Sequence, residues 1–313
     1  MVLKAALVLT LVYAGLVGCV FIAQESLVYF PNMGREVAVT PAAHGLPYED
    51  VSIRTQDGET LNAWWVPAPE PRGAVVLFHG NAGNISHRID YARMFRALGY
   101  STLLVDYRGY GKSTGSPSEE GTYRDALASW RWLTETRGVR AADVVVFGES
   151  LGGAVACWLA ERHPPRALVL ASTFTSVPDL GAEIYPFLPV RLISRIHYNT
   201  LACVPKVSAP VLVIHSARDE IVPFSHGRKL YEAAREPRHF LEVTGGHNDG
   251  FVFMRPEWVS ALGAFLERAG PSASGPALRR RRPQGGRRKG IIRPFAGGEQ
   301  GVGGMPPRPA NPL

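Results

Sequence analysis

Residues 143–153 read DVVVFGESLGG. The apolar run VVVF is typical of a strand buried on both faces of a parallel sheet. Residues 148–152 then fit the pattern G-x-S-x-G, and helical spacing begins directly after them. A serine at such a sharp strand-to-helix turn sits in a strained backbone with its hydroxyl exposed, and small residues two positions away let neighbouring backbone pass close by. The segment therefore predicts an α/β fold in which Ser150 is a nucleophile.

Strands and helices alternate along the middle of the chain. The predicted strands are 51–55, 61–66, 74–79, 101–106, 143–147, 167–171, 211–215 and 240–243, and the predicted helices are 86–98, 122–134, 152–162, 225–234 and 256–268. Such alternation predicts right-handed crossovers and a mostly parallel sheet with helices on both faces. The first two strands are separated only by the turn residues QDGE, which predicts an antiparallel hairpin at the sheet edge.

A serine nucleophile needs a base, and the base needs an orienting acid. On this architecture the acid and then the histidine follow the serine, each just after a later strand. Residues 211–220 read VLVIHSARDE, a buried strand and then a loop with Asp219. Residues 240–249 read FLEVTGGHND, a strand and a Gly-Gly turn before His247. The sequence thus predicts Ser150, Asp219 and His247 as the catalytic residues.

Three other carboxylates compete with Asp219 for the role of the acid. Glu220 is adjacent and would point elsewhere, and Asp249 would need a tight local turn to reach the ring of His247. Asp179 follows an earlier strand and is the better competitor.

The negative charge formed during acyl transfer needs two backbone N–H donors. Leu151, directly after the nucleophile, is predicted to supply one of them. The other should come from the loop after the third strand, which reads HGNAGN at residues 79–84, and Asn81 is the expected donor. An ordinary turn is the alternative interpretation of this loop.

The segment DYRGYGKSTG at 106–115 has some features of a phosphate-binding loop. The Walker pattern requires a glycine where Asp106 stands, and the G-x-G-x-x-G pattern fails at Thr114. Metal-ligand spacings such as H-E-x-x-H are also missing from the sequence, and Cys19, Cys157 and Cys203 form no C-x-x-C pair. We therefore expect no nucleotide, other cofactor or metal.

The net charge of +7 comes from the C-terminal end of the chain. Residues 271–313 contain nine of the 34 Lys and Arg and one of the 27 acids, which leaves 25 bases and 26 acids in residues 1–270. The overall basicity is therefore no evidence for a nucleic-acid partner. The tail is rich in Gly, Pro and Arg and predicts disorder. A solvated tail is the first interpretation of its basic cluster, and contact with anionic lipid headgroups is the second. Nucleic-acid binding is the third, and it is disfavoured if the tail lies outside the cytoplasm.

The chain begins with the uncharged run AALVLTLVYAGLVGCVFIA at residues 5–23. Its 19 residues would span about 28 Å as a helix, close to the thickness of a hydrocarbon core. Lys4 precedes the run and Glu25 follows it, so the positive-inside rule places the rest of the chain outside the cytoplasm. We expect a retained signal anchor at residues 1–24. A cleaved signal peptide and a lipoprotein signal at Cys19 are the alternatives.

In combination, these motifs resemble the α/β-hydrolases, and within them the BEM46-like, ABHD13- or ABHD17-type membrane-anchored serine hydrolases. The matching pieces are LVYFP at 27–31, HGNAGN at 79–84, DYRGYGKSTGSPSE at 106–119, GESLGG at 148–153, RDEIVP at 218–223 and GGHND at 245–249. The resemblance covers roughly residues 25–268. It implies an eight-stranded, mostly parallel sheet flanked by helices, and hydrolysis of carboxylic esters or thioesters.

The composition, rich in Arg, Ala, Gly and Pro, suggests a bacterial source and hence the inner membrane.

The expected hydrolase domain is 25–270, with a small cap at about 174–206 between the sixth and seventh strands. This cap is apolar and interrupted by prolines, and its Tyr185, Phe187 and Leu188 would line an acyl pocket. Packing of a helix on the sheet is the alternative for these residues. With a membrane anchor, an apolar or lipid-like acyl ester is the expected small-molecule substrate. A serine peptidase or amidase and a non-catalytic binding protein of the same fold remain the alternative functions.

Overall fold

The structure is a computed structural model that describes residues 1–249 and 255–270. Its strands are β1 (Glu49–Arg54), β2 (Thr60–Val66), β3 (Gly73–Phe78), β4 (Tyr100–Val105), β5 (Val144–Glu149), β6 (Ala167–Ala171), β7 (Val211–Ser216) and β8 (Arg238–Val243). Its α-helices are α1 (Val2–Val28), α2 (Ile89–Ala97), α3 (Glu119–Arg131), α4 (Leu151–Arg162), α5 (Val177–Ile184), α6 (Val190–Ile193), α7 (Thr200–Cys203), α8 (Phe224–Ala233) and α9 (Pro256–Arg268). The predicted tail, 271–313, lies outside the described residues.

The described strands form one eight-stranded sheet in the order β1-β2-β4-β3-β5-β6-β7-β8. Strands β3 to β8 pair in parallel, while β2 is antiparallel to both β1 and β4. The predicted mostly parallel sheet and the predicted edge hairpin are both confirmed. Gly58, at φ +95°, supplies the left-handed backbone that closes this hairpin.

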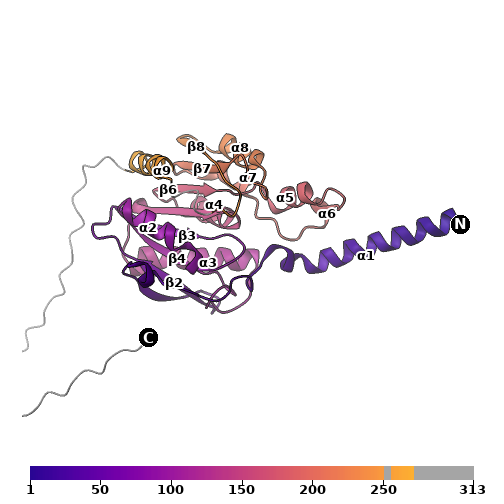
Figure 1. Cartoon of the computed structure of the whole chain (residues 1–313), viewed down its shortest axis with the longest axis horizontal. Helices are drawn as coiled ribbons and strands as arrows, with labels where there is room; N and C mark the ends of the chain where they lie inside the picture. Colours follow the sequence, from indigo (N-terminus) through magenta and orange to yellow (C-terminus); the bar gives the residue numbers. More distant parts are fainter. Residues whose placement is uncertain (250–254, 271–313) are drawn as a thin grey trace, which may run out of the picture. The chain divides into compact units, whose positions relative to one another are not determined.

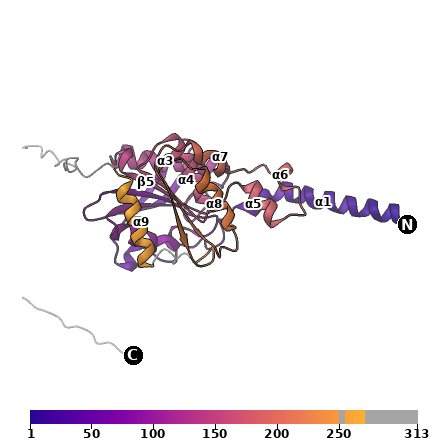
Figure 2. The ribbon, with the colours of Figure 1, turned by 90° about the horizontal axis from the view of Figure 1, so that it is seen from above.

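Helices cover both faces of the sheet, as the apolar strands require (Figures 1 and 2). Buried side chains of α3, α4 and α8 pack in one cluster with alternate residues of the strands, such as Val76 and Val146. Side chains of α2 and α9 form the second cluster with the intervening residues, such as Leu77 and Phe147. Full burial of each such side chain contributes about 1.5–3 kcal/mol before entropy is counted. The sheet is thus a rigid platform for the loops at its carboxyl edge.

Two helices do not start where the spacing predicts: α3 begins earlier than residue 122, and α2 begins at Ile89, later than residue 86. Ser118 accepts a hydrogen bond from the backbone of Gly121, so α3 begins at Glu119 instead of residue 122. Asn84 caps a 3-10 turn, η2 (Ile85–Arg88), that precedes α2. Apolar periodicity predicts which face of a helix is buried, but it does not predict at which residue the helix begins.

Residues 172–210, between β6 and β7, hold three short helices instead of a single long crossover. They are α5, α6 and α7, followed by the 3-10 turn η5 (Val204–Lys206). This is the segment predicted as a cap, and we call residues 174–206 the cap.

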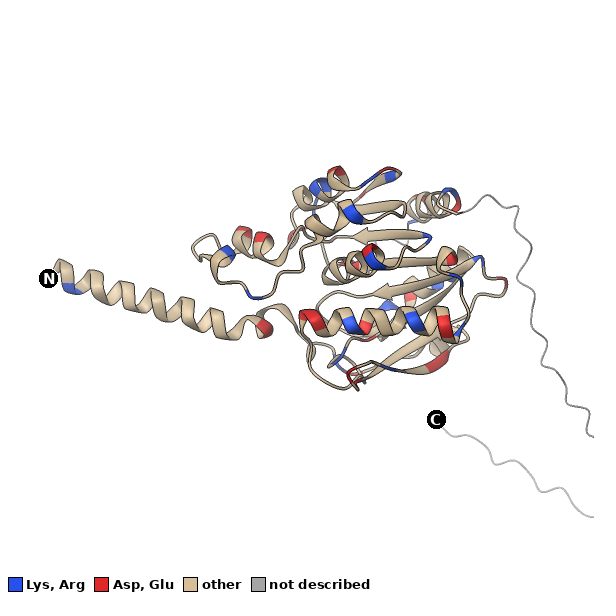
Figure 3. Cartoon of the chain, turned by 180° about the vertical axis from the view of Figure 1, so that it is seen from behind, with Lys and Arg blue, Asp and Glu red and all other residues tan. Residues whose placement is uncertain are grey.

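The N-terminal helix α1 is 27 residues long, and among the described helices it is the one that is long and apolar enough to cross a membrane. Most of its apolar side chains are exposed. Figure 3 shows one basic band near its start and one acidic band near its end, which are Lys4 and Glu25.

Candidate active site

The turn between β5 and α4 has the strained geometry that the G-x-S-x-G pattern predicts. Ser150 adopts φ +53° and ψ −118°, a region that non-glycine residues rarely enter. A Cβ atom on Gly148 would lie 2.2 Å from the carbonyl oxygen of Gly152, and one on Gly152 would lie 2.1 Å from the carbonyl oxygen of Phe78. Both positions therefore need glycine, and their close packing holds Ser150 at the start of α4.

Substituting Gly152 by alanine is expected to destabilise the protein by about 2–4 kcal/mol, because neither backbone can move away cheaply. Urea unfolding of the full chain in detergent measures this effect. Gly15→Ala is the matched control, because a Cβ atom there meets nothing within 4 Å and alanine favours a helix. Equal stability of the two variants would contradict the close packing at this turn.

Ser150, His247 and Asp219 lie in one hydrogen-bonded chain. His247 Nε2 is 3.1 Å from Ser150 Oγ, and His247 Nδ1 is 2.8 Å and 3.0 Å from the two carboxylate oxygens of Asp219. Asp219 accepts two further hydrogen bonds, from the backbone N–H groups of Ile221 and Val222. Burial alone would raise the pKa of Asp219, but these donors and the His247 ring outweigh it and lower the pKa. The carboxylate is therefore ionised and oriented to bind a protonated imidazole.

The competing acids have other partners. Glu220 accepts a hydrogen bond from the backbone N–H of His247 at 2.9 Å, so it holds the histidine loop and does not touch the ring. Asp249 accepts from the backbone of Gly246. Asp179 lies in the first turn of α5, where its carboxylate accepts a hydrogen bond from Thr175 Oγ1 and pairs with Arg191. Of the four candidate acids, the structure brings Asp219 to the imidazole.

Within the described part of the chain, neither of the two expected oxyanion donors has a hydrogen-bond acceptor. Among the described residues, the backbone N–H groups of Asn81 and Leu151 donate to no protein atom. A Cβ atom on Gly80 would lie 3.5 Å from Ser150 Cβ, so the 79–84 loop passes directly beside Ser150. Leu151 is the first residue of α4, whose dipole places partial positive charge at the same point.

Asn81 is fixed in place by segments far away in the sequence. Its carbonyl oxygen accepts hydrogen bonds from the backbone N–H of Phe30, at 3.0 Å, and from Tyr110 Oη, at 2.8 Å. Its side-chain amide donates to the carbonyl oxygen of Val28, the last residue of α1. The loop beside Ser150 is thus tied to the end of the N-terminal helix, a link that the sequence did not indicate.

The predicted pocket residues of the cap differ in exposure. Leu188 is buried, with 9% of its surface exposed, whereas Tyr185 and Phe187 are 45% and 62% exposed. The rings of Tyr185 and Phe187 pack edge to face, with centroids 6.3 Å apart. The two aromatic residues are thus largely exposed, and a pocket formed by all three remains a prediction.

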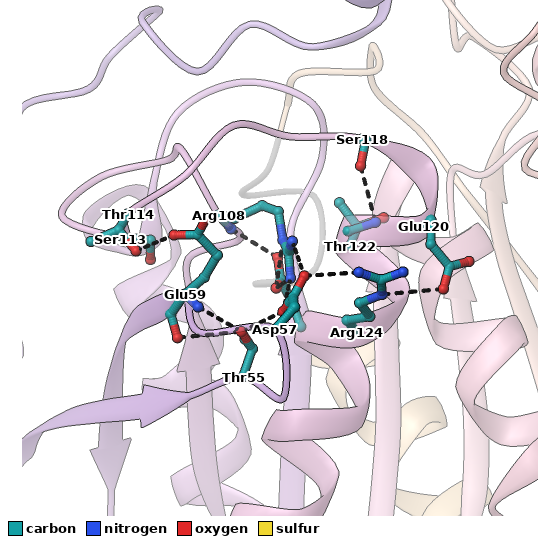
Figure 4. Close-up of polar contacts among 12 residues, drawn as sticks. Thr55, Asp57, Glu59, Arg108, Ser113, Thr114, Ser118, Glu120, Thr122 and Arg124 are labelled. Atoms are coloured by element: carbon teal, nitrogen blue, oxygen red, sulfur yellow. Dashed lines mark hydrogen bonds and ion pairs between the residues drawn. The ribbon is translucent and has the colours of Figure 1, made fainter.

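The loop that resembles a phosphate site contains a buried ion-pair network that the sequence analysis missed (Figure 4). Arg108 forms hydrogen bonds with Asp125 of α3 and with Asp57 of the β1–β2 turn. Asp125 also accepts from the backbone N–H of Arg108, at 2.8 Å. The loop thereby joins the edge hairpin to α3. The three residues are widely separated in the sequence, so no local pattern pairs them.

Comparisons with known proteins agree with this architecture. An uncharacterized protein of Mycobacterium tuberculosis is 43% identical over 268 residues, which cover 84% of this chain and 94% of that protein. The protein bem46 of Schizosaccharomyces pombe is 37% identical over 232 residues, covering 70% of this chain and 76% of its own. The chain belongs to the BEM46-like α/β-hydrolases. A family model described as "Serine aminopeptidase, S33" matches residues 69–202 of this BEM46-like hydrolase.

One further relative and one solved structure are similar to this chain. The lysophosphatidylserine lipase ABHD12 of Danio rerio is 32% identical over 244 residues, covering 66% of this BEM46-like hydrolase and 62% of the lipase. An esterase of Pyrococcus furiosus superposes with a TM-score of 0.64 at 24% identity, covering 74% of this chain and 95% of the esterase. The latter shows the shared α/β-hydrolase fold.

Two buried histidines make the stability of the fold depend on pH. Burial lowers the pKa of His215 and of His226, and His226 Nδ1 accepts a hydrogen bond from the backbone N–H of Thr175, so both rings are neutral in the folded state. Their stabilising contribution is present above the unfolded pKa of about 6.5 and is lost as the pH falls through the lower folded values.

The free energy of unfolding is therefore expected to decrease between about pH 7 and about pH 5. Urea unfolding across this range in detergent measures the slope. His226→Asn keeps an acceptor near the position of Nδ1 and should reduce the slope. A stability that rises toward acid pH would contradict the buried neutral state.

Proposed function

We propose that this BEM46-like hydrolase is a serine esterase that cleaves carboxylic esters, including thioesters, through a covalent acyl-enzyme. The hydrogen bond between Ser150 Oγ and His247 Nε2, at 3.1 Å, is the observation that carries the proposal. Together with the bonds between His247 and Asp219, it supports the roles of hydroxyl, base and acid that acyl transfer requires.

In the first half of the reaction, Ser150 Oγ attacks the carbonyl carbon while its proton passes to His247 Nε2. Asp219 holds the imidazole through Nδ1 and stabilises its protonated form. The backbone N–H groups of Asn81 and Leu151 receive the negative charge on the carbonyl oxygen, and each such donor typically lowers the barrier by about 3 kcal/mol. His247 then gives its proton to the leaving alcohol or thiol. Water, deprotonated by His247, releases the acyl group from Ser150.

We propose an apolar acyl group for the substrate on the composition of the cap and on one relative. The cap is rich in apolar and aromatic side chains, and the related lipase ABHD12 is named for a lysophospholipid substrate. A peptidase is the second candidate, because the matched family model is described as a serine aminopeptidase and the same three residues cleave amides.

A substrate panel separates the two candidates. Purified full-length enzyme in detergent is assayed with esters and thioesters of short and long acyl chains and with aminoacyl amides. We expect kcat/KM to be highest for an ester with a long acyl chain. A preference for aminoacyl amides would replace the esterase proposal by the peptidase. No turnover of any of these substrates by folded enzyme would favour a binding protein of the same fold.

We further propose that α1 anchors the enzyme in the inner membrane of a bacterium, with the hydrolase domain of residues 25–270 outside the cytoplasm. The apolar length of α1 and the basic residue at its start support this orientation. A reporter fused to the C-terminus, active only outside the cytoplasm, tests it. Contact of the basic tail with anionic lipid is a separate proposal that lies outside the described residues.

The bond between Tyr110 and Asn81 gives a test of the oxyanion loop. Tyr110→Phe removes one of the two hydrogen bonds to the carbonyl oxygen of Asn81 and leaves the aromatic packing intact. We expect kcat to fall by about 5- to 10-fold with KM nearly unchanged, because the loop would present its N–H less rigidly to the transition state. Tyr100→Phe is the matched control, because Tyr100 is buried at the other end of the sheet. A change in KM alone would contradict the role of the Asn81 loop in binding the oxyanion.

A further inference from the structure

The cap forms hydrogen bonds with the N-terminal helix α1 at two places. Tyr13 Oη donates a hydrogen bond of 2.8 Å to the carbonyl oxygen of Phe187. Nearer the hydrolase domain, the Gln24 side chain donates to the carbonyl oxygen of Ile193, at 2.8 Å, and accepts from the backbone N–H of Arg195, at 2.6 Å. Figures 1 and 2 both show α5 and α6 beside α1. Two separate sets of bonds therefore fix the cap along this helix.

These contacts place the cap at the depth of the apolar part of α1. Gln24 is the first polar residue after the uncharged run 5–23, whereas Tyr13 lies near the middle of that run. From Tyr13 to Ala23 the helix rises about 15 Å, which is half the thickness of a typical hydrocarbon core. If α1 spans a bilayer, the segment from Phe187 to Ile193 enters the leaflet next to the hydrolase domain.

Four large apolar side chains of the cap are exposed over the same segment. Ile184, Tyr185, Phe187 and Leu192 are 46%, 45%, 62% and 88% exposed. We call these four residues the cap tip. Exposed apolar side chains of this size so near one another in the chain are unfavourable in water and typical of a site that contacts protein or membrane.

The backbone of the cap tip also suits an apolar surrounding, where unpaired polar groups are costly. Pro186 and Pro189 have no N–H group to satisfy. Tyr13 pairs with the carbonyl oxygen of Phe187. Other backbone N–H groups of the segment donate within the cap, namely those of Tyr185, Leu188, Leu192 and Ile193.

The charges near the cap tip are compatible with this position. Arg191 is paired with Asp179, at 3.1 Å. Arg195 stacks over the ring of Phe21 at 5.0 Å, near the end of the uncharged run. Both long side chains can extend their charged ends toward the headgroups.

We propose that the cap tip inserts into the hydrocarbon of the membrane and contacts lipid acyl chains there. The acyl substrate then reaches Ser150 from the bilayer, past the cap. The second statement rests on the proposed esterase function, whereas the insertion itself does not.

Site-specific fluorescence tests the insertion without any assay of activity. In the full chain with Cys19→Ser, single Phe187→Cys and Leu192→Cys variants are labelled with an environment-sensitive dye and reconstituted in phosphatidylcholine vesicles. Cys157 and Cys203 are buried and remain. Glu135→Cys is the matched control, because residue 135 is exposed and distant from the cap. Glu119, the first residue of α3, bonds to the cap, whereas residue 135 lies beyond the C-terminal end of this helix.

We expect the dye at 187 and 192 to shift to the blue and to be quenched by lipids with a spin label on the acyl chain, but not by iodide. The dye at 135 should show the opposite pattern. Quenching by iodide at all three positions, with none by the spin-labelled chains, would overturn the proposal. Spectra in detergent before reconstitution verify that each variant is folded.

A kinetic measurement tests the route of the substrate. The double variant Phe187→Ser, Leu192→Ser is compared with wild type on a long-chain ester in vesicles and on a short, water-soluble ester. We expect the ratio of the two kcat/KM values to fall by about tenfold, which corresponds to about 1.4 kcal/mol. An unchanged ratio would overturn the delivery of substrate from the bilayer. If wild type cleaves neither ester, the esterase proposal fails, and the fluorescence result alone decides the insertion.

Discussion

Replacing His247 by alanine is expected to lower kcat toward acyl esters by about 10⁶-fold, because the proposed nucleophile, base and acid act as one unit. In the proposed mechanism the imidazole accepts the Ser150 proton during attack and gives it to the leaving group. The side chain of His247 is only 9% exposed, and its ring is bonded on both sides. No other described histidine ring contacts Ser150 Oγ, so none can take over its role.

The measurement is the initial rate on the best ester of the substrate panel, with thermal unfolding to verify the fold. His44→Ala is the matched control, because His44 is exposed and far along the chain from the nucleophile. We expect this control to retain wild-type kcat. If His247→Ala keeps more than about one hundredth of the wild-type kcat, His247 is not the base of the reaction.

Replacing Asp125 by alanine is expected to destabilise the protein by about 3–5 kcal/mol, because the buried guanidinium of Arg108 would lose its buried carboxylate partner. Arg108 is 6% exposed and Asp125 is fully buried. Burial raises the pKa of Asp125, and the Arg108 hydrogen bonds offset this only in part. The pair therefore adds little net stability, but the loss of one partner is costly.

Asp57→Ala provides the comparison at the same guanidinium. The Asp57 side chain is 26% exposed and stands at the rim of the network, so water can replace it. We expect a loss of about 1 kcal/mol or less for this variant. Chemical unfolding of both variants and wild type in the same detergent gives the difference. An equal loss of unfolding free energy in the two variants would contradict our explanation, which attributes the difference to the unequal burial of the two carboxylates.

The sequence predicts those parts of the fold that depend on local patterns. Continuous apolar runs identify β3 to β7, since strands buried on both faces admit few polar residues. The glycines around Ser150 predict the sharp turn, because backbone packs where their Cβ atoms would stand. The order of the strands also predicts that the loops with Asp219 and His247 lie at the same edge of the sheet.

Other features depend on tertiary packing and leave no local signal. The bonds of Asn81 to Val28 and Phe30 join residues about fifty positions apart. The network of Arg108 draws on Asp57 and Asp125, which lie on either side of it in the chain. The exposure of Phe187 also could not be predicted, because an apolar residue of a cap can face the substrate, the sheet or the membrane.

Labelling by a fluorophosphonate tests the central claim most directly, since this probe reacts with serine only where a base and oxyanion donors activate it. The full chain in detergent is treated with the probe, digested and analysed by mass spectrometry. The account predicts one phosphonylated peptide, which contains Ser150, and no adduct in Ser150→Ala. An unmodified Ser150 in folded wild-type protein, or an adduct that persists in Ser150→Ala, would contradict it.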